Sequence, residues 1–160
     1  MARATVLIVD DDEGVRMGLG HSLHGDGYRL LFAASPAEAL DLLRAGPVDV
    51  VISDHLMPGM TGLEFLKLVR DRHPDCVRIM LTGHADVEMA IQALNQGEIY
   101  RFLHKPCERT ELQVTVHLAC ERLALERENR RLLSILRTHP DLMELVESQA
   151  PRPGRLAPGG

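Results

Sequence analysis

The sequence lacks the features that mark membrane, disulfide-linked and nucleic-acid-binding proteins. No uninterrupted apolar run approaches the roughly 20 residues that a membrane-spanning helix needs, and residues 1–5 show no secretory signal pattern. The three cysteines, Cys76, Cys107 and Cys120, form no metal-binding pair, which is typical of a reducing compartment. The formal net charge of −5 argues against a direct nucleic-acid interface. We therefore expect a cytoplasmic protein that binds neither membrane nor nucleic acid.

What the sequence contains is an alternation of short apolar runs and amphipathic segments. A helix start is clear where Ser35 can cap, Pro36 follows and Glu38 completes a capping box, and Asp86 is predicted to cap a later helix. Strands that alternate with helices form a parallel sheet covered on both faces. We expect a flavodoxin-like, doubly wound α/β fold with strand order 2-1-3-4-5 and an extended C-terminal helix. Its five strands are predicted over residues 6–9, 28–33, 50–53, 77–81 and 99–103.

The stretch from Val50 to Gly62 indicates where a functional site lies. Its apolar run ends in Asp54, and a turn rich in proline and glycine follows at once. Ligands of an open α/β sheet bind at the carboxyl ends of its strands. Taken alone, however, Asp54 could equally serve as the cap of the next helix.

Three other predicted strands also end in polar residues. The acidic run 10–12 follows the first strand, Thr82 ends the fourth, and Lys105 follows the fifth. In the expected strand order these ends are neighbours, so the side chains should converge on Asp54. Clustered carboxylates require a cation, and ligands that are all oxygen suit Mg²⁺. A hydroxyl and an ammonium group beside them suit an anion, and together these are the parts that phosphoryl transfer requires.

With these motifs the sequence resembles the receiver domain of bacterial two-component response regulators. The resemblance covers roughly residues 4–120. It implies that Asp54 accepts a phosphoryl group from a sensor histidine kinase or a phosphotransfer protein, and that the modified domain acts on a downstream protein partner. The matching segments occur in order: Leu7-Ile8-Val9-Asp10-Asp11, Asp54 followed by Met57-Pro58-Gly59-Met60-Thr61-Gly62, Leu81-Thr82-Gly83, and Lys105-Pro106.

The resemblance also implies a Mg²⁺ site. Asp10, Asp11 and Asp54 would supply carboxylate ligands, and Leu56 would supply its backbone carbonyl. Because three acids follow one another, Asp12 could take the place of Asp10 in this set.

Further residues have implied roles in the response to phosphorylation. Thr82 would bind a phosphoryl oxygen once Asp54 is modified, and Lys105 would pair with the phosphate. Phe102 matches the aromatic residue that turns inward on activation, although it could also be a plain core residue. The peptide bond between Lys105 and Pro106 is expected to be cis.

Two features depart from the usual receiver pattern. Leu56 and His84 occupy the positions that tune the lifetime of the phosphate, and an apolar Leu56 cannot position a hydrolytic water, whereas His84 could. The segment from Gly97 to Phe102 carries one residue more than usual. That spacing resembles receivers attached to HD-GYP phosphodiesterases or to enhancer-binding activators.

Two other classes of protein use similar residues. A phosphatase of the haloacid dehalogenase type also has a strand-end pair such as Asp10 and Asp12, with a threonine and a lysine, but it has no need of Asp54. A pseudo-receiver would be an interaction module that never takes phosphate. We expect neither, and no enzymatic activity beyond the domain's own phosphorylation and dephosphorylation.

The sequence divides into a receiver domain over residues 1–121, a helical extension over 122–149 and a disordered tail over 150–160. Leucines recur every seven residues from Leu118 to Leu132, with Asn129 at an interleaved position. This pattern predicts a coiled-coil seam over residues 118–136 and hence a possible homodimer. The alternative is a helix whose first half packs on the sheet and whose second half is charged and frayed.

Overall fold

The computed structural model describes residues 4–150 of the chain. The chain forms two compact units, which divide between Leu123 and Ala124. The first unit thus ends two residues beyond the boundary proposed from the sequence, because the side chain of Leu123 is only 2% exposed and belongs to the core. Except for Ala150, the tail predicted to be disordered lies outside the described residues.

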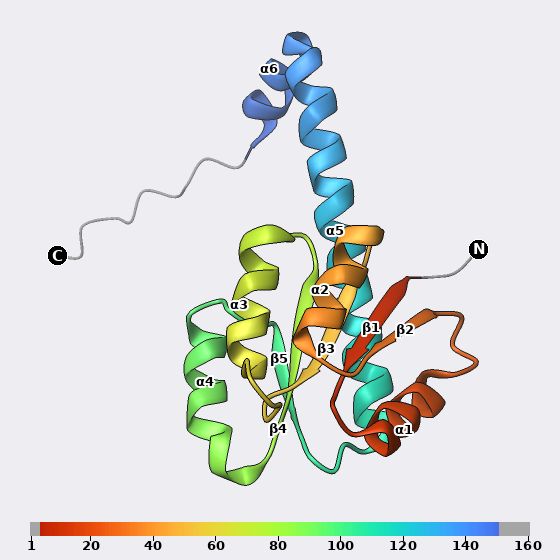
Figure 1. The fold of residues 1–160 in the computed structure, drawn as a ribbon. Helices are drawn as coiled ribbons and strands as arrows, with labels where there is room; N and C mark the ends of the chain where they lie inside the picture. Colours follow the sequence, from red (N-terminus) through yellow and green to blue (C-terminus); the bar gives the residue numbers. More distant parts are fainter. Residues whose placement is uncertain (1–3, 151–160) are drawn as a thin grey trace, which may run out of the picture. The chain divides into compact units, whose positions relative to one another are not determined.

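A five-stranded parallel sheet forms the centre of the first unit (Figure 1). The strand order is β2-β1-β3-β4-β5, as the sequence predicts, and every neighbouring pair is parallel. The carboxyl ends of β1, β3, β4 and β5 therefore lie next to one another along one edge. The strands are β1 (Thr5–Val9), β2 (Arg29–Ala33), β3 (Val50–Asp54), β4 (Val77–Thr82) and β5 (Arg101–His104).

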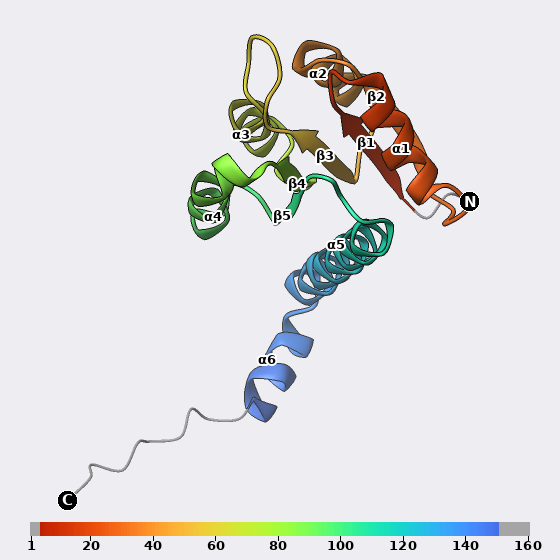
Figure 2. The same cartoon turned by 90° about the horizontal axis from the view of Figure 1, so that it is seen from below.

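Helices cover both faces of this sheet (Figure 2). Residues of α1 and the first part of α5 share one core cluster, and residues of α2, α3 and α4 share the other. The helices are α1 (Glu13–Leu23), α2 (Pro36–Ala45), α3 (Gly62–Arg72), the 3₁₀ turn η1 (His84–Asp86), α4 (Val87–Asn95) and α5 (Arg109–Thr138).

The strands divide their side chains between the two core clusters. Val51 belongs to the cluster that contains Phe65 of α3, whereas its neighbour Ile52 belongs to the cluster that contains Leu112 of α5. Every residue of β3 is buried, and the strand is apolar on both faces up to Ile52, after which Ser53 and Asp54 end it. In the observed register, Asp54 at the end of β3 lies opposite Leu81 of β4.

The helix starts test the capping predictions. The Ser35 hydroxyl accepts from the Glu38 backbone N–H at 3.2 Å, and the Glu38 carboxylate accepts from the Ala34 N–H at 3.0 Å, so the predicted cap of α2 is confirmed. The prediction for Asp86 is confirmed in position only. Asp86 occupies the N-cap position of α4, but its side chain makes no capping hydrogen bond there, because η1 leads into the helix.

Strand β5 begins later than the sequence predicts. Ile99 is buried, but the ladder with β4 starts at Arg101. The reason is Arg78 of β4, whose guanidinium donates to the backbone carbonyls of Glu98 at 2.8 Å and Gly97 at 3.3 Å. These bonds hold the preceding loop against β4 in an irregular form, so only four residues remain for the strand.

The second unit contains the remainder of α5 and a further helix, α6 (Pro140–Gln149). Helix α5 continues without a break to Thr138. His139 is the N-cap residue of α6, without a side-chain cap, and the helix ends at Gln149. None of the described helices has the length and hydropathy required to cross a lipid bilayer.

Candidate functional site

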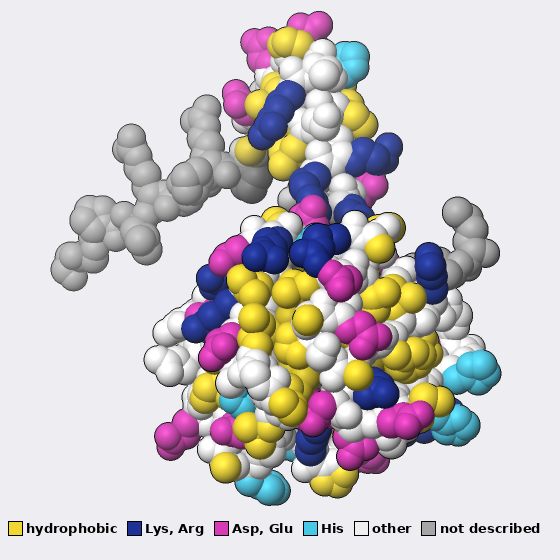
Figure 3. Space-filling model, in the orientation of Figure 1, with side chains coloured by type: hydrophobic (Ala, Val, Ile, Leu, Met, Phe, Trp, Pro, Cys, Tyr) yellow, Lys and Arg dark blue, Asp and Glu magenta, His cyan; other side chains and the backbone are white. Residues whose placement is uncertain are grey.

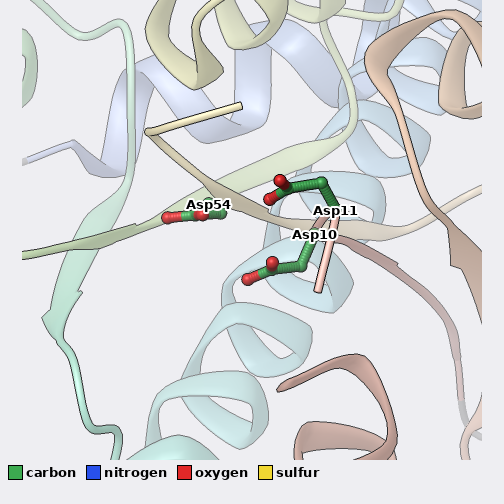
Figure 4. A group of neighbouring side chains, drawn as sticks. All are labelled: Asp10, Asp11 and Asp54. Carbon is green, nitrogen blue, oxygen red and sulfur yellow. The ribbon is translucent and has the colours of Figure 1, made fainter. Parts of the chain in front are cut away.

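Three carboxylates meet where β1 and β3 end (Figure 4). One oxygen each from Asp10, Asp11 and Asp54 lie within 4.8 Å of one another. Asp10 is fully buried and Asp54 is only 6% exposed, whereas Asp11 faces solvent. Two desolvated acids and one exposed acid thus share a small volume, which is unfavourable unless positive charge neutralises them.

Lys105 supplies positive charge to this cluster from the end of β5. Its Nζ lies 3.0 Å from Oδ1 of Asp54 and 3.1 Å from Oδ2 of Asp10. Burial alone would lower the pKa of Lys105, but the hydrogen bonds to the two carboxylates outweigh it, and the pKa is raised. The Lys105–Pro106 peptide bond is cis.

Asp10 is held in place from several directions. Its backbone N–H donates to the Ala33 carbonyl at 3.2 Å, and its Oδ1 accepts from the Asp12 N–H at 2.9 Å. Arg16, one turn into α1, donates from Nη1 to the Asp10 carbonyl at 2.7 Å. Burial raises the pKa of the Asp10 carboxyl despite the Asp12 and Lys105 hydrogen bonds. The site therefore contains a buried, hydrogen-bonded acid beside its charge partner.

The neighbouring Asp12 does not belong to the carboxylate cluster. Its side chain accepts from the Val15 N–H at 3.1 Å and so caps α1. The ambiguity between Asp10 and Asp12 is thereby resolved in terms of position: Asp10 and Asp11 lie beside Asp54, whereas Asp12 serves the helix.

Thr82 and Phe102 lie on the β4 and β5 side of the site. Thr82 is buried, and its hydroxyl donates to the Gly83 carbonyl at 3.1 Å. Phe102 is half-buried against the core cluster of α2 to α4, and its ring meets the His104 ring edge-on at 5.8 Å. The lifetime-tuning candidate His84 is exposed at the start of η1.

The loop after Asp54 approaches the strand end very closely. A Cβ atom on Gly62 would lie 2.0 Å from the Asp54 carbonyl oxygen, so only glycine fits there. The Gly62 N–H donates to the His55 carbonyl at 2.8 Å, which closes the loop. Leu56, in contrast, projects outward with 65% of its surface exposed. The loop thus presents an exposed apolar side chain two residues after Asp54.

The carboxylate cluster fits a hard divalent cation. Oxygen ligands without nitrogen or sulfur suit Mg²⁺, which binds through a few carboxylates and retains waters. Among residues 4–150, this is the one group of three or more acids, histidines or cysteines close enough to share an ion. Asp10, Asp11 and Asp54 would hold it.

Comparison with known proteins decides the family. The model of the response regulator receiver domain matches residues 6–117. The chain belongs to this family. It therefore contains a receiver domain of the two-component type, and the family match favours this over the phosphatase alternative.

Two curated relatives are similar over most of this chain. The hydrogenase transcriptional regulatory protein HoxA of Cupriavidus necator is 40% identical over 147 residues, which are 92% of this chain and 30% of that protein. The DNA-binding transcriptional regulator NtrC of Escherichia coli is 35% identical over 132 residues, 82% of this chain and 28% of that protein. The chain thus spans less than a third of the length of these relatives.

A solved structure shows the same fold. The signal receiver domain of an HD domain-containing protein from Pseudomonas fluorescens Pf-5 is 37% identical, with a TM-score of 0.73 over 80% of this chain and 95% of that one.

Two contributors to the site were missed in the sequence. Arg16 lies one helical turn beyond the cap residue Asp12, a spacing that could have indicated a side chain turned back toward the strand end. His104, which contacts the rings of both His84 and Phe102, directly precedes Lys105 but carried no motif of its own.

Proposed function

We propose that Asp54 is the phosphoryl acceptor of this receiver domain. The observation that carries the proposal is the approach of Lys105 Nζ to Asp54 and Asp10 within a cluster of three carboxylates. A surface aspartate needs no such surroundings, whereas an acceptor needs a cation site and a fixed ammonium group beside the carboxylate oxygen that reacts.

The donor in this proposal is the phosphohistidine of a sensor kinase or a phosphotransfer protein. A carboxylate oxygen of Asp54 attacks phosphorus, the P–O bond forms as the P–N bond breaks, and the electron pair stays on the departing nitrogen. The other ring nitrogen already carries a proton, so neutral imidazole leaves. Asp10, Asp11, Asp54 and the backbone carbonyl of Leu56 would hold Mg²⁺, which supplies positive charge to the phosphoryl oxygens. Any catalysis by the domain is confined to gaining and losing this group.

The response to phosphorylation would begin at Thr82 and Lys105. The Thr82 hydroxyl, now bonded to the Gly83 carbonyl, would turn to a phosphoryl oxygen, and Lys105 would exchange its Asp54 contact for the phosphate. Phe102 is only half-buried, so space vacated near Thr82 would allow its ring to turn inward. This would reshape the face of α4 and β5 for a downstream protein partner.

We also propose that residues 118–136 pair with a second copy of the chain. Within this segment Leu125 is 72% exposed, and Leu132, Leu133 and Ile135 are also exposed. On the helical extension, apolar side chains reach the surface among charged ones (Figure 3). Leu118, Leu125 and Leu132 recur at the spacing of a coiled-coil seam, so an identical helix would bury them.

Incubation with acetyl phosphate tests the acceptor function. In Mg²⁺ the intact mass should rise by one phosphoryl group, and in EDTA it should not. Asp54→Asn should remain unmodified, whereas the matched variant Asp12→Asn should react like the wild type, because Asp12 caps α1 outside the cluster. Uptake by Asp54→Asn equal to that of the wild type would contradict the proposal.

A further inference from the structure

A pair of histidines lies beside the proposed switch residues. The rings of His84 and His104 have centroids 5.7 Å apart and planes inclined by 30°. His104 ends β5 and pairs in register with Thr82 of β4, and the Lys105 N–H donates to the Thr82 carbonyl at 2.9 Å. His84 follows Thr82 by two residues at the start of η1. The pairing of β4 with β5 therefore holds the backbone of His104 and of Thr82, two residues before His84.

Both histidines are open to a ligand. Each is exposed, and within residues 4–150 no hydrogen bond or ion pair occupies the ring nitrogens of either one. Two imidazoles that share a zinc-like ion at a metal–nitrogen distance of about 2.1 Å hold their ring centres roughly 5–6 Å apart. The observed separation of 5.7 Å between the ring centres falls in this range.

We propose that His84 and His104 form a binding site for a divalent transition-metal ion of the class that prefers imidazole, such as Ni²⁺, Zn²⁺ or Cu²⁺. Nitrogen ligands select these ions, whereas the all-oxygen cluster of Asp10, Asp11 and Asp54 selects Mg²⁺. The two sites thus differ in chemistry, and the histidine site does not depend on phosphoryl transfer. Waters or an incoming molecule would complete its coordination shell.

Occupation of this site would connect two segments that the switch must move. His84 belongs to the loop after Thr82, and the His104 ring contacts the ring of Phe102. A metal ion bound to both would tie the loop to the end of β5. The ion would thereby stabilise one state of the proposed switch, phosphorylated or unphosphorylated, relative to the other.

The probe for this site is Ni²⁺, titrated calorimetrically into the untagged chain. Ni²⁺ avoids the preference of zinc for thiolates, which Cys107 and Cys120 could supply at partly exposed positions. Excess Mg²⁺ occupies the carboxylate cluster during the titration. We expect one Ni²⁺ per chain.

Histidine variants show where the ion binds. Removing a residue that only hydrogen-bonds to a metal ligand commonly weakens metal binding by about tenfold. His84→Ala and His104→Ala remove the proposed ligands themselves, so each should weaken Ni²⁺ binding about tenfold or more. The double variant should be little worse than either single one. Replacement of His21 and His24, both exposed near the end of α1, should have no effect.

Two outcomes would overturn the proposal. One is Ni²⁺ binding by the double variant with the affinity of the wild type. The other is loss of binding in the α1 control or in His117→Ala, whose ring lies 3.1 Å from the Glu121 carboxylate on α5 and offers a rival site. All the substituted histidines are exposed, so circular dichroism should show an intact fold in each variant.

Discussion

Lys105 places its Nζ 3.0 Å from Oδ1 of Asp54, so the proposed acceptor is already paired with the group that would later hold its phosphate. The raised pKa of Lys105 means that its ammonium form is stabilised by folding. This contribution is fully present below pH 10.5 and is lost as the pH rises through the higher folded-state value. At neutral pH, Lys105 thus offsets part of the repulsion among the carboxylates.

Lys105→Ala should separate phosphate uptake from output. Uptake from acetyl phosphate should continue in Mg²⁺, because the cation supplies most of the neutralising charge. A charge-assisted hydrogen bond contributes about 1.5–3 kcal/mol, so its loss should shift the switch about tenfold or more toward the inactive form. Binding of the phosphorylated variant to a partner, or its dimerisation, measures this. The matched control is Lys67→Ala, whose lysine pairs with Glu98 away from the site. Wild-type output from phosphorylated Lys105→Ala would show that Lys105 has no such role.

Asp10→Asn should stabilise the metal-free protein. The pKa of Asp10 is raised by burial, so its ionised form is less favourable in the folded chain than in the unfolded one. Such a group opposes folding above its folded-state pKa, and the penalty disappears as the pH falls below 3.8. In EDTA, the variant should therefore melt at a higher temperature than the wild type at pH 7, with the difference shrinking toward pH 4. Added Mg²⁺ should stabilise the wild type more than the variant. A lower melting temperature for Asp10→Asn at pH 7 in EDTA would contradict this account.

Gly62→Ala should disrupt the acceptor strand end. The added Cβ would lie 2.0 Å from the Asp54 carbonyl oxygen and 2.7 Å from the His55 Cα, so the backbone must move. We expect a loss of about 1–3 kcal/mol or more in the free energy of unfolding, together with slower phosphorylation. Gly18→Ala is the control: its Cβ would meet no atom within 4 Å in α1, and alanine should gain about 0.5–1 kcal/mol. Urea unfolding of the two variants gives the comparison. Equal free energies of unfolding for Gly62→Ala and Gly18→Ala would mean that the close approach of Gly62 to Asp54 does not require glycine.

Leu56→Asn should shorten the lifetime of the phosphorylated state. Leu56 is exposed two residues after Asp54 and cannot orient a water, whereas an amide can hold one near phosphorus. In the wild type, His84 is the residue that could position a hydrolytic water. His84→Ala should therefore lengthen the lifetime of the phosphorylated state. Decay of the phosphorylated mass after removal of acetyl phosphate measures both variants. Identical decay in wild type and Leu56→Asn would exclude a lifetime role for this position.

Truncation after Ala124 should yield a monomer that still takes up phosphate. A cut after Glu121, at the boundary expected from the sequence, would remove Leu123 from the core and Arg122, whose guanidinium lies 5.0 Å from the centre of the Tyr100 ring. Cutting after Ala124 preserves both residues and removes most of the proposed seam. Sedimentation compares the truncated and full-length chains. A full-length chain that stays monomeric at high concentration, with and without phosphate, would eliminate the coiled-coil proposal.

The strand order and the convergence of the carboxylates could be predicted because both depend on local patterns. Once Val50 to Ser53 form a buried parallel strand, Asp54 must emerge at the same edge of the sheet as Asp10. The sequence pattern is thus sufficient to predict where a strand-end side chain lies, because periodicity and strand direction determine its position.

Other features depended on contacts between distant residues. Arg78 donates hydrogen bonds to the carbonyls of Gly97 and Glu98, so that β5 begins only after Ile99. No pattern in the sequence around Ile99 indicates these hydrogen bonds. The contact between His84 and His104 depends on the register of β4 with β5, which sequence periodicity leaves open. These features are set by tertiary packing rather than by local propensity.

The most direct test of the central proposal locates the acyl phosphate itself. Borohydride reduces a phosphorylated aspartate to homoserine, which tandem mass spectrometry can assign to one position. After treatment with acetyl phosphate and Mg²⁺, the account predicts homoserine at position 54 and unchanged aspartates at positions 10, 11 and 12. Homoserine at one of those three positions, with Asp54 intact, would contradict it.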